Sequence, residues 1–406
     1  MILKRNQAII LGWSTAVVLI AVNIAYVSSF TGFIHPAAEV LETDHYRYLE
    51  MARGPEIRAR SSRLAQEPPF CWRLLIPFLA YLTAQVGLGL DPAFFLITNV
   101  FLVGFLFVFY LYLRQSGAGT GYSLLGITLV ALTPGAVRWY EYQYWMTDPA
   151  GLFLVTLGFA LIHSGKTTCL LAVGVIAVAA RETYLAVLVY YFFYLWKRHG
   201  FTAAVKRGWL VFLLPVVLLV LIRQFVITSG SYDIAEIAGK VIKFRLENFW
   251  ESQFYLLTVG SFGVILPLLF LFPARLPAAF RDHYDKLIFV LVIYSSLTVG
   301  YNTDRLLAYT LPVLLIPALG NLKKFIDYSK LPAAGVIMLV IALQIFFYLS
   351  TRFYGYPAIS IFQPASLPVA AVMLLFWILS WGIMRRRLTL KNKIQTREDM
   401  QGRINS

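Results

Sequence analysis

Ionisable and aromatic side chains gather directly after the first membrane-length apolar run of the chain. The stretch from Glu42 to Tyr48 contains Asp44, His45, Tyr46 and Arg47, next to where a bilayer surface would lie. Packing alone is a poor explanation for so many ionisable groups and tyrosines in one short stretch. The stretch fits a polar substrate that is bound at the mouth of a membrane protein.

Further charged residues lie at the ends of later apolar runs. Asp148 opens one run, Arg181 and Glu182 separate two others, and Asp304 and Arg305 open a fourth. Charged side chains near membrane depth are costly and therefore indicate function. Each aspartate could instead cap the helix that follows it, and the Arg181–Glu182 pair could be a turn at the interface. Arg305 has neither of these structural explanations.

Composition places the chain among polytopic all-α membrane proteins. Of its 406 residues 59% are apolar and 14% are charged, and the mean hydropathy is +0.70, which excludes a soluble core. The net charge of +15 lies in short clusters between apolar runs, which is typical of membrane orientation and not of nucleic-acid binding. Residues 8–30 are too long for a signal-peptide core and indicate a retained anchor helix.

We expect about twelve membrane-spanning helices with both termini in the cytoplasm, in an inner or plasma membrane. The run from Leu74 to Val86 is short for a span, and we interpret it as a surface-lying helix. If it crossed the membrane, every later loop would change sides. Treating it as surface-lying places most basic clusters inside and the charges described above at the outer face. The expected spans are 8–30, 94–113, 119–136, 149–163, 168–181, 183–196, 209–227, 254–272, 286–301, 306–320, 331–350 and 366–384.

Two further segments are expected at the outer surface. The first loop, residues 31–93, is far longer than the other connections, and long loops commonly carry function. Residues 233–252 alternate apolar with charged side chains, which predicts an amphipathic helix in the interface.

The order of these features resembles the GT-C superfamily of integral-membrane glycosyltransferases. The resemblance rests on Asp44 in the first outer loop, on the stretch Pro68 to Pro77 that contains Phe70 and Arg73, and on Asp148 in the next outer loop. It covers roughly the first seven helices. It implies one transmembrane domain over 1–406, with a catalytic module at 1–227 that includes the loop 31–93. Residues 228–406 would supply variable helices and a basic cytoplasmic tail.

The resemblance also implies a sugar donor on a polyprenyl phosphate and a glycan, lipid-linked or protein acceptor, among membrane lipids. In this interpretation Asp44 is the catalytic base, and Asp148 orients the acceptor. Arg181 and Arg305 hold the lipid phosphate, because the arginine fork matches phosphate oxygens. The resemblance leaves a divalent cation (Mg²⁺ or Mn²⁺) open, with Asp44 and Asp148 as its ligands. The remaining expected substrate-binding residues are Glu182, Asp304, His45, Tyr46 and Arg73.

Two other functions fit part of the pattern. Twelve spans are common in transporters and in flippases of lipid-linked sugars, but the second half of the chain does not repeat the first, as inverted-repeat carriers do. A glycan polymerase or ligase at the outer face differs from the first interpretation only in its acceptor.

Overall fold

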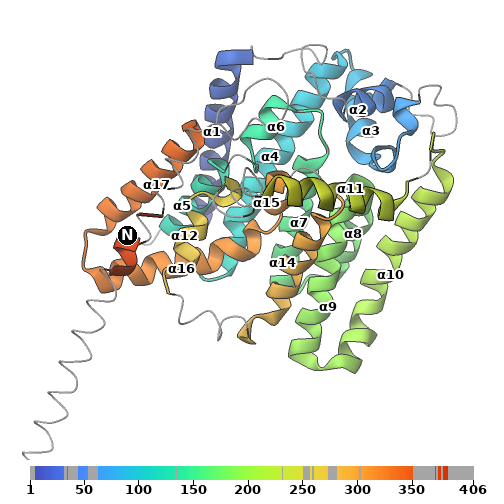
Figure 1. Ribbon diagram of the computed structural model, residues 1–406. Helices are drawn as coiled ribbons and strands as arrows, with labels where there is room; N and C mark the ends of the chain where they lie inside the picture. Colours follow the sequence, from blue (N-terminus) through green and yellow to red (C-terminus); the bar gives the residue numbers. More distant parts are fainter. Residues whose placement is uncertain are drawn as a thin grey trace, which may run out of the picture.

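The computed structural model describes residues 5–31, 34, 44–53, 63–133, 135–230, 232–249, 257, 260–272, 281–300, 303–350, 371, 374–375 and 378–382. Over these residues the backbone forms helices, turns and bends, and no strand (Figure 1). The expected all-α class is confirmed for this part of the chain.

Three helices are long and apolar enough to cross a bilayer: α1 (Arg5–Thr31), α4 (Leu90–Gln115) and α10 (Phe201–Phe225). At ~1.5 Å per residue, each exceeds the ~30 Å thickness of a hydrocarbon core. Large apolar side chains of α10 remain exposed, among them Trp209 and Leu221. These features agree with a helical membrane protein.

The expected number of twelve spans is not confirmed, because the other apolar helices are shorter than a span or lie partly outside the described residues. Several of these helices nevertheless begin within two residues of the start of an expected span. These are α7 (Asp148–His163), α8 (Thr167–Ala180), α9 (Leu185–His199), α14 (Tyr284–Ser296) and α17 (Ala333–Ser350).

Other expected spans differ from the structure. The span expected at 119–136 ends early, as α5 (Thr120–Ala131), and the short α6 (Arg138–Tyr142) follows it. The span expected at 306–320 is divided into α15 (Thr303–Ala308) and α16 (Leu311–Ser329). Pro312 lies in the first turn of α16, where proline favours a new helix start. The spans expected at 254–272 and 366–384 lie partly outside the described residues, and α12 (Ile265–Leu269) belongs to the first of them.

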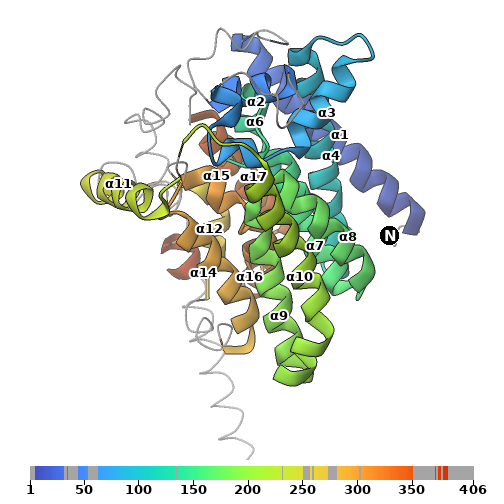
Figure 2. The same ribbon diagram turned by 90° about the vertical axis from the view of Figure 1, so that its right-hand side faces the viewer.

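Helices α7, α8, α9 and α10 lie side by side, and α4 packs along α7 (Figures 1 and 2). Small residues permit this close packing: a Cβ added to Gly104 of α4 would stand 3.1 Å from the ring of Phe153 in α7. The chain turns from α9 into α10 at Gly200, whose φ of +81° favours glycine. We call the end of the bundle that contains this turn the hairpin end.

Short helices gather at the opposite end of the bundle, beyond the start of α9. They are α2 (Asp44–Arg53), two 3-10 turns (Leu64–Gln66 and Phe70–Trp72) and α3 (Leu75–Ala84). With 10 residues, α3 is ~15 Å long, about half the thickness of a hydrocarbon core. It has the length of a surface helix and not that of a span.

The expected amphipathic segment at 233–252 forms α11 (Ile234–Glu247), which lies across the direction of α8, α9 and α10 in both views (Figures 1 and 2). The Asp233 carboxylate caps its first turn, accepting hydrogen bonds from Ala235 N at 2.8 Å and Glu236 N at 3.2 Å. At its other end the Arg245 guanidinium donates to Leu297 O at 2.9 Å and to Thr303 Oγ1 at 2.5 Å. Arg245 thereby ties α11 to the segment that leads into α15.

Candidate active site

A cavity of about 630 Å³ opens where the short helices meet the start of α9. Its lining contains four arginines, Arg73, Arg181, Arg223 and Arg305, and we call it the arginine cavity. Asp44 and Glu182 are the carboxylates of this lining. Apolar side chains from α9, α11 and α14 also line it, Leu185, Ile237, Val292 and Ile293 among them. The cavity therefore combines a cationic surface with an apolar one.

Arg47 fixes the position of Asp44. Its Nη1 lies 2.7 Å from Asp44 Oδ1, while its Nε and Nη2 donate to the two carboxylate oxygens of Glu67 at 2.8 and 2.7 Å. Burial lowers the pKa of Arg47, but the hydrogen bond to Glu67 and the charges of Asp44 and Glu67 outweigh it, so that this pKa is raised. Asp44, whose side chain is 25% exposed, is thus held on α2 against the turn that precedes Phe70.

Asp148 joins the two arginines that come from α8 and α15. Its side chain is fully buried and its Oδ2 accepts a hydrogen bond from Arg305 Nη2 at 2.9 Å and forms an ion pair with Arg181 Nη1. The Tyr309 hydroxyl donates to the backbone oxygen of Asp148 at 3.4 Å. Arg181 and Arg305 line the cavity, whereas Asp148 lies behind them. The two guanidinium groups thus share one buried carboxylate.

The helix-cap explanation of Asp148 is not what the structure shows. Thr147 occupies the N-cap of α7 and makes no side-chain cap hydrogen bond, while the printed contacts of the Asp148 carboxylate are with arginines. Within the described part of the chain, Arg181 Nε and Asp148 Oδ1 have no hydrogen-bond partner. The site therefore retains unused hydrogen-bonding capacity beside the cavity.

Arg73 and Glu182 form a two-pronged pair between the first loop and the turn from α8 to α9. Arg73 Nη2 and Nε donate to the two Glu182 oxygens at 2.5 and 3.2 Å, and Arg73 Nη1 donates to the Tyr48 hydroxyl at 3.1 Å. Burial by itself raises the pKa of Glu182, but the charge of Arg73 outweighs it and lowers this pKa to about 2. The pair stays ionised at neutral pH and links the two segments.

Arg223 is the fourth cation of the cavity wall. It lies near the end of α10, with its guanidinium carbon 4.6 Å from the centroid of the Trp72 ring. Trp72 in turn packs edge-on against Tyr232, at 5.6 Å between ring centroids. Among the described residues, no carboxylate forms an ion pair with Arg223. Its charge remains available to an anionic ligand at the rim.

Comparison of the chain with protein-family models finds no match, and comparison with curated proteins finds no significant match.

Most of the expected site residues meet at the arginine cavity. Asp44, Arg73, Arg181, Glu182 and Arg305 line it. Three others do not line it. Asp148 lies behind Arg181 and Arg305, His45 is 1% exposed with its ring 5.1 Å from that of Trp145, and Tyr46 packs against His45 at 4.1 Å. The side chain of Asp304 lies outside the described residues.

Sequence reasoning missed the supporting residues. Arg47 follows Asp44 by three positions, which places the two side chains on one helix face. Arg223 is a single charge near the end of a long apolar helix, a pattern that indicates function. No sequence signal pointed to Glu67 or Tyr309, because their partners are distant in the chain.

The carboxylates expected to bind a divalent cation are both occupied by arginine. Asp44 pairs with Arg47, and Asp148 pairs with Arg181 and Arg305. In the searched part of the chain, no group of three or more His, Cys, Asp or Glu side chains has the arrangement of a metal site. In the described part of the chain, both expected ligands of a divalent cation are thus ion-paired with arginine.

Proposed function

We propose that the chain is a membrane glycosyltransferase, which moves a sugar from a polyprenyl-phosphate donor to an acceptor hydroxyl in the arginine cavity. The observation that carries the proposal is the cavity itself, whose lining combines four arginines and Asp44 with apolar side chains. A sugar on a lipid phosphate needs both surfaces: cations for the phosphate and an apolar surface for the first part of the lipid chain.

Asp44 is the base of the proposed reaction. Its carboxylate takes the proton of the acceptor hydroxyl while the acceptor oxygen forms a bond to the anomeric carbon of the donor sugar. The bond between the anomeric carbon and the phosphate oxygen breaks, and its electron pair leaves with the lipid phosphate. Arg47 holds the Asp44 carboxylate in place at the wall through the 2.7 Å hydrogen bond.

The leaving phosphate gains negative charge as the bond breaks, and arginines prepositioned for this charge lower the barrier. Arg181 and Arg305 occupy the buried part of the wall, where a low dielectric strengthens their interaction with the phosphate. In this proposal Asp148 is a positioning residue, because it contacts the arginines and not the cavity. This differs from the expected role of Asp148 in orienting the acceptor.

The location and partners follow from the same proposal. The donor is a sugar on a polyprenyl phosphate, and the acceptor is a glycan, a lipid-linked sugar or a protein. The arginine cavity would face the outer side of the inner or plasma membrane, with the hairpin end and both termini in the cytoplasm. The basic residues at the hairpin end, among them Lys197, Arg198, Lys206 and Arg207, support this orientation.

The direct test of the base is Asp44→Asn, assayed with the purified full-length protein and a radiolabelled polyprenyl-phosphate sugar. Loss of a general base should lower turnover by roughly 10²–10⁴-fold. The matched control is Glu50→Gln on the same helix, because Glu50 pairs with the exposed Arg53 and does not line the cavity. Near-normal turnover of Asp44→Asn would exclude Asp44 as the base.

The same assay separates transferase from flippase. In detergent no second compartment exists, so a flippase yields no covalent product. Absence of transfer with every donor and acceptor tried, together with lipid movement across proteoliposomes, would replace the transferase proposal with a transporter.

A further inference from the structure

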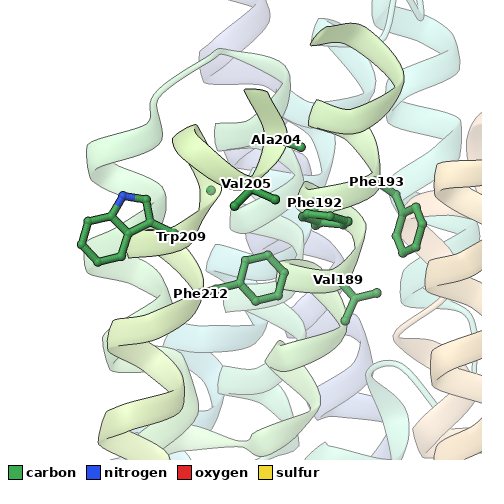
Figure 3. Close-up of a pocket in the computed structure, with 8 residues that line it drawn as sticks. Val189, Phe192, Phe193, Ala204, Val205, Trp209 and Phe212 are labelled. Atoms are coloured by element: carbon green, nitrogen blue, oxygen red, sulfur yellow. The ribbon is translucent and has the colours of Figure 1, made fainter. Parts of the chain in front are cut away.

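A second cavity, of about 410 Å³, lies between α9 and α10 towards the hairpin end. Its lining is apolar, with Val189, Phe192 and Phe193 from α9 and Val205, Trp209 and Phe212 from α10. Phe192, Val205 and Phe212 lie between the two helices (Figure 3). Ala204 and Gly208 complete the lining. None of these residues belongs to the arginine cavity. We call this cavity the α9–α10 groove.

The groove opens on a surface that a membrane would cover. Trp209 is 52% exposed and Val205 is 44% exposed, and both belong to α10, one of the helices long enough to span a bilayer. At the hairpin end, Trp196 stacks on Phe193 at 5.5 Å and packs edge-on against Phe201 at 5.4 Å. A hollow lined by aromatic and aliphatic side chains can hold hydrocarbon in van der Waals contact on several sides.

Two exposed cations lie near the groove on α10. Lys206 precedes Trp209 by three residues, so the two are surface neighbours on the open side of the groove, whereas Arg207 lies beyond the buried Ala204 on the other side of the helix. In the described part of the chain, no carboxylate forms an ion pair with Lys206 or Arg207. Lys197, by contrast, is already bound to Asp285 at 3.0 Å. The groove thus combines an apolar hollow with cationic charge at its side.

We propose that the α9–α10 groove binds an anionic phospholipid of the surrounding bilayer. One acyl chain lies in the hollow along Val205 and Phe212, and the phosphate lies beside Lys206. Basic pockets between membrane helices on the cytoplasmic side are suited to anionic head groups. This inference does not depend on the proposed transferase activity, because the groove shares no residue with the arginine cavity.

The test compares phosphatidylglycerol with phosphatidylcholine, each titrated onto the full-length protein in detergent and counted by native mass spectrometry. The wild-type protein should retain phosphatidylglycerol more tightly. The double variant Lys206→Gln/Arg207→Gln should weaken phosphatidylglycerol binding roughly fivefold or more, because a basic side chain near an anionic lipid contributes about fivefold. Its phosphatidylcholine binding should be unchanged.

The matched control is Lys323→Gln/Lys324→Gln on α16. It removes the same charge from two exposed lysines that do not line the groove, and it should leave phosphatidylglycerol binding at the wild-type level. An equal loss in both double variants would mean non-specific attraction and would overturn the proposal. Equal binding of the two lipids to the wild-type protein would overturn it as well. So would phosphatidylglycerol binding that is unchanged in the Lys206→Gln/Arg207→Gln variant.

Filling the hollow tests the acyl-chain contact separately. A Cβ added at Gly208 would meet only Leu195 Cδ1, at an ordinary 3.6 Å, so Gly208→Leu should be accommodated with its side chain in the groove. It should weaken the binding of both lipids. Val205→Trp is the second filling variant if Gly208→Leu does not fold. Unchanged lipid binding in a folded filling variant would contradict occupation of the groove.

Discussion

The arginine cavity and the α9–α10 groove are built on the same two helices, yet their chemistry is opposite. Helix α9 contributes Leu185 to the first and Phe192 to the second, while α10 contributes Arg223 to the first and Trp209 to the second. At the groove the helices supply the whole lining. At the arginine cavity Arg223 is the charged group that α10 supplies, and the other charged groups come from α2, the first loop, the α8–α9 turn and α15. Helix packing provides an apolar hollow, and the segments added around helix ends provide the chemistry.

The largest expected effect comes from removing the carboxylate that two buried arginines share. Asp148→Asn removes the carboxylate that Arg181 and Arg305 share, and breaking a buried ion pair costs about 3–5 kcal/mol. The variant should unfold at a markedly lower temperature and lose sugar transfer at least tenfold.

The control for this prediction is Asp233→Asn. Asp233 caps α11, and asparagine caps a helix about as well, so its unfolding temperature and activity should stay near wild type. If Asp148→Asn behaves like this control, the shared ion pair contributes little and Asp148 is dispensable.

A second, smaller effect tests whether geometry or charge matters at the cavity wall. Arg305→Lys keeps the charge but loses the two-pronged contact with phosphate, so we expect donor use to fall at least tenfold. Steady-state kinetics with varied donor concentration measures it. Arg198→Lys at the hairpin end is the matched control, because Arg198 stacks on Tyr194 and does not line the cavity. A full-activity Arg305→Lys enzyme would show that charge alone suffices.

The smallest expected effect is a pH dependence carried by the Arg73–Glu182 pair. The pKa of Glu182 is lowered to about 2 in the folded chain, below the ~4.3 of an unfolded glutamate. Stability from this pair is therefore fully present above pH ~4.3 and is lost as the pH falls towards 2. The unfolding-temperature difference between wild type and Glu182→Gln should be constant from pH 7 to 5 and shrink below that range. A difference that shrinks between pH 7 and 5 would contradict the assigned pair.

The sequence predicted which charged residues lie together better than it predicted which residues they pair with. Asp44, Arg181 and Arg305 each stand at the end of an apolar run, and this local signal was enough to place them at one site. The ion-pair partner of each charged residue could not be predicted, because these ion pairs join positions far apart in the chain. Arg305 lies 157 residues from Asp148, and Arg47 lies 20 residues from Glu67.

Helix existence was likewise easier to predict than helix ends. Apolar length located α1, α4 and α10, whereas the break between α15 and α16 depends on a proline within an apolar run. The α9–α10 groove was not anticipated, because its aromatic side chains are also what a buried helix face contains. Only their three-dimensional arrangement leaves the hollow.

The most direct test of the transferase account is a density map of the protein with a polyprenyl-phosphate sugar bound, using Asp44→Asn to prevent turnover. The account predicts the phosphate within hydrogen-bonding distance of Arg181 or Arg305, the sugar beside position 44 and the lipid along the wall formed by Val292 and Ile293. A donor bound outside the arginine cavity, for example with its phosphate at Lys206 and Arg207, would contradict the account.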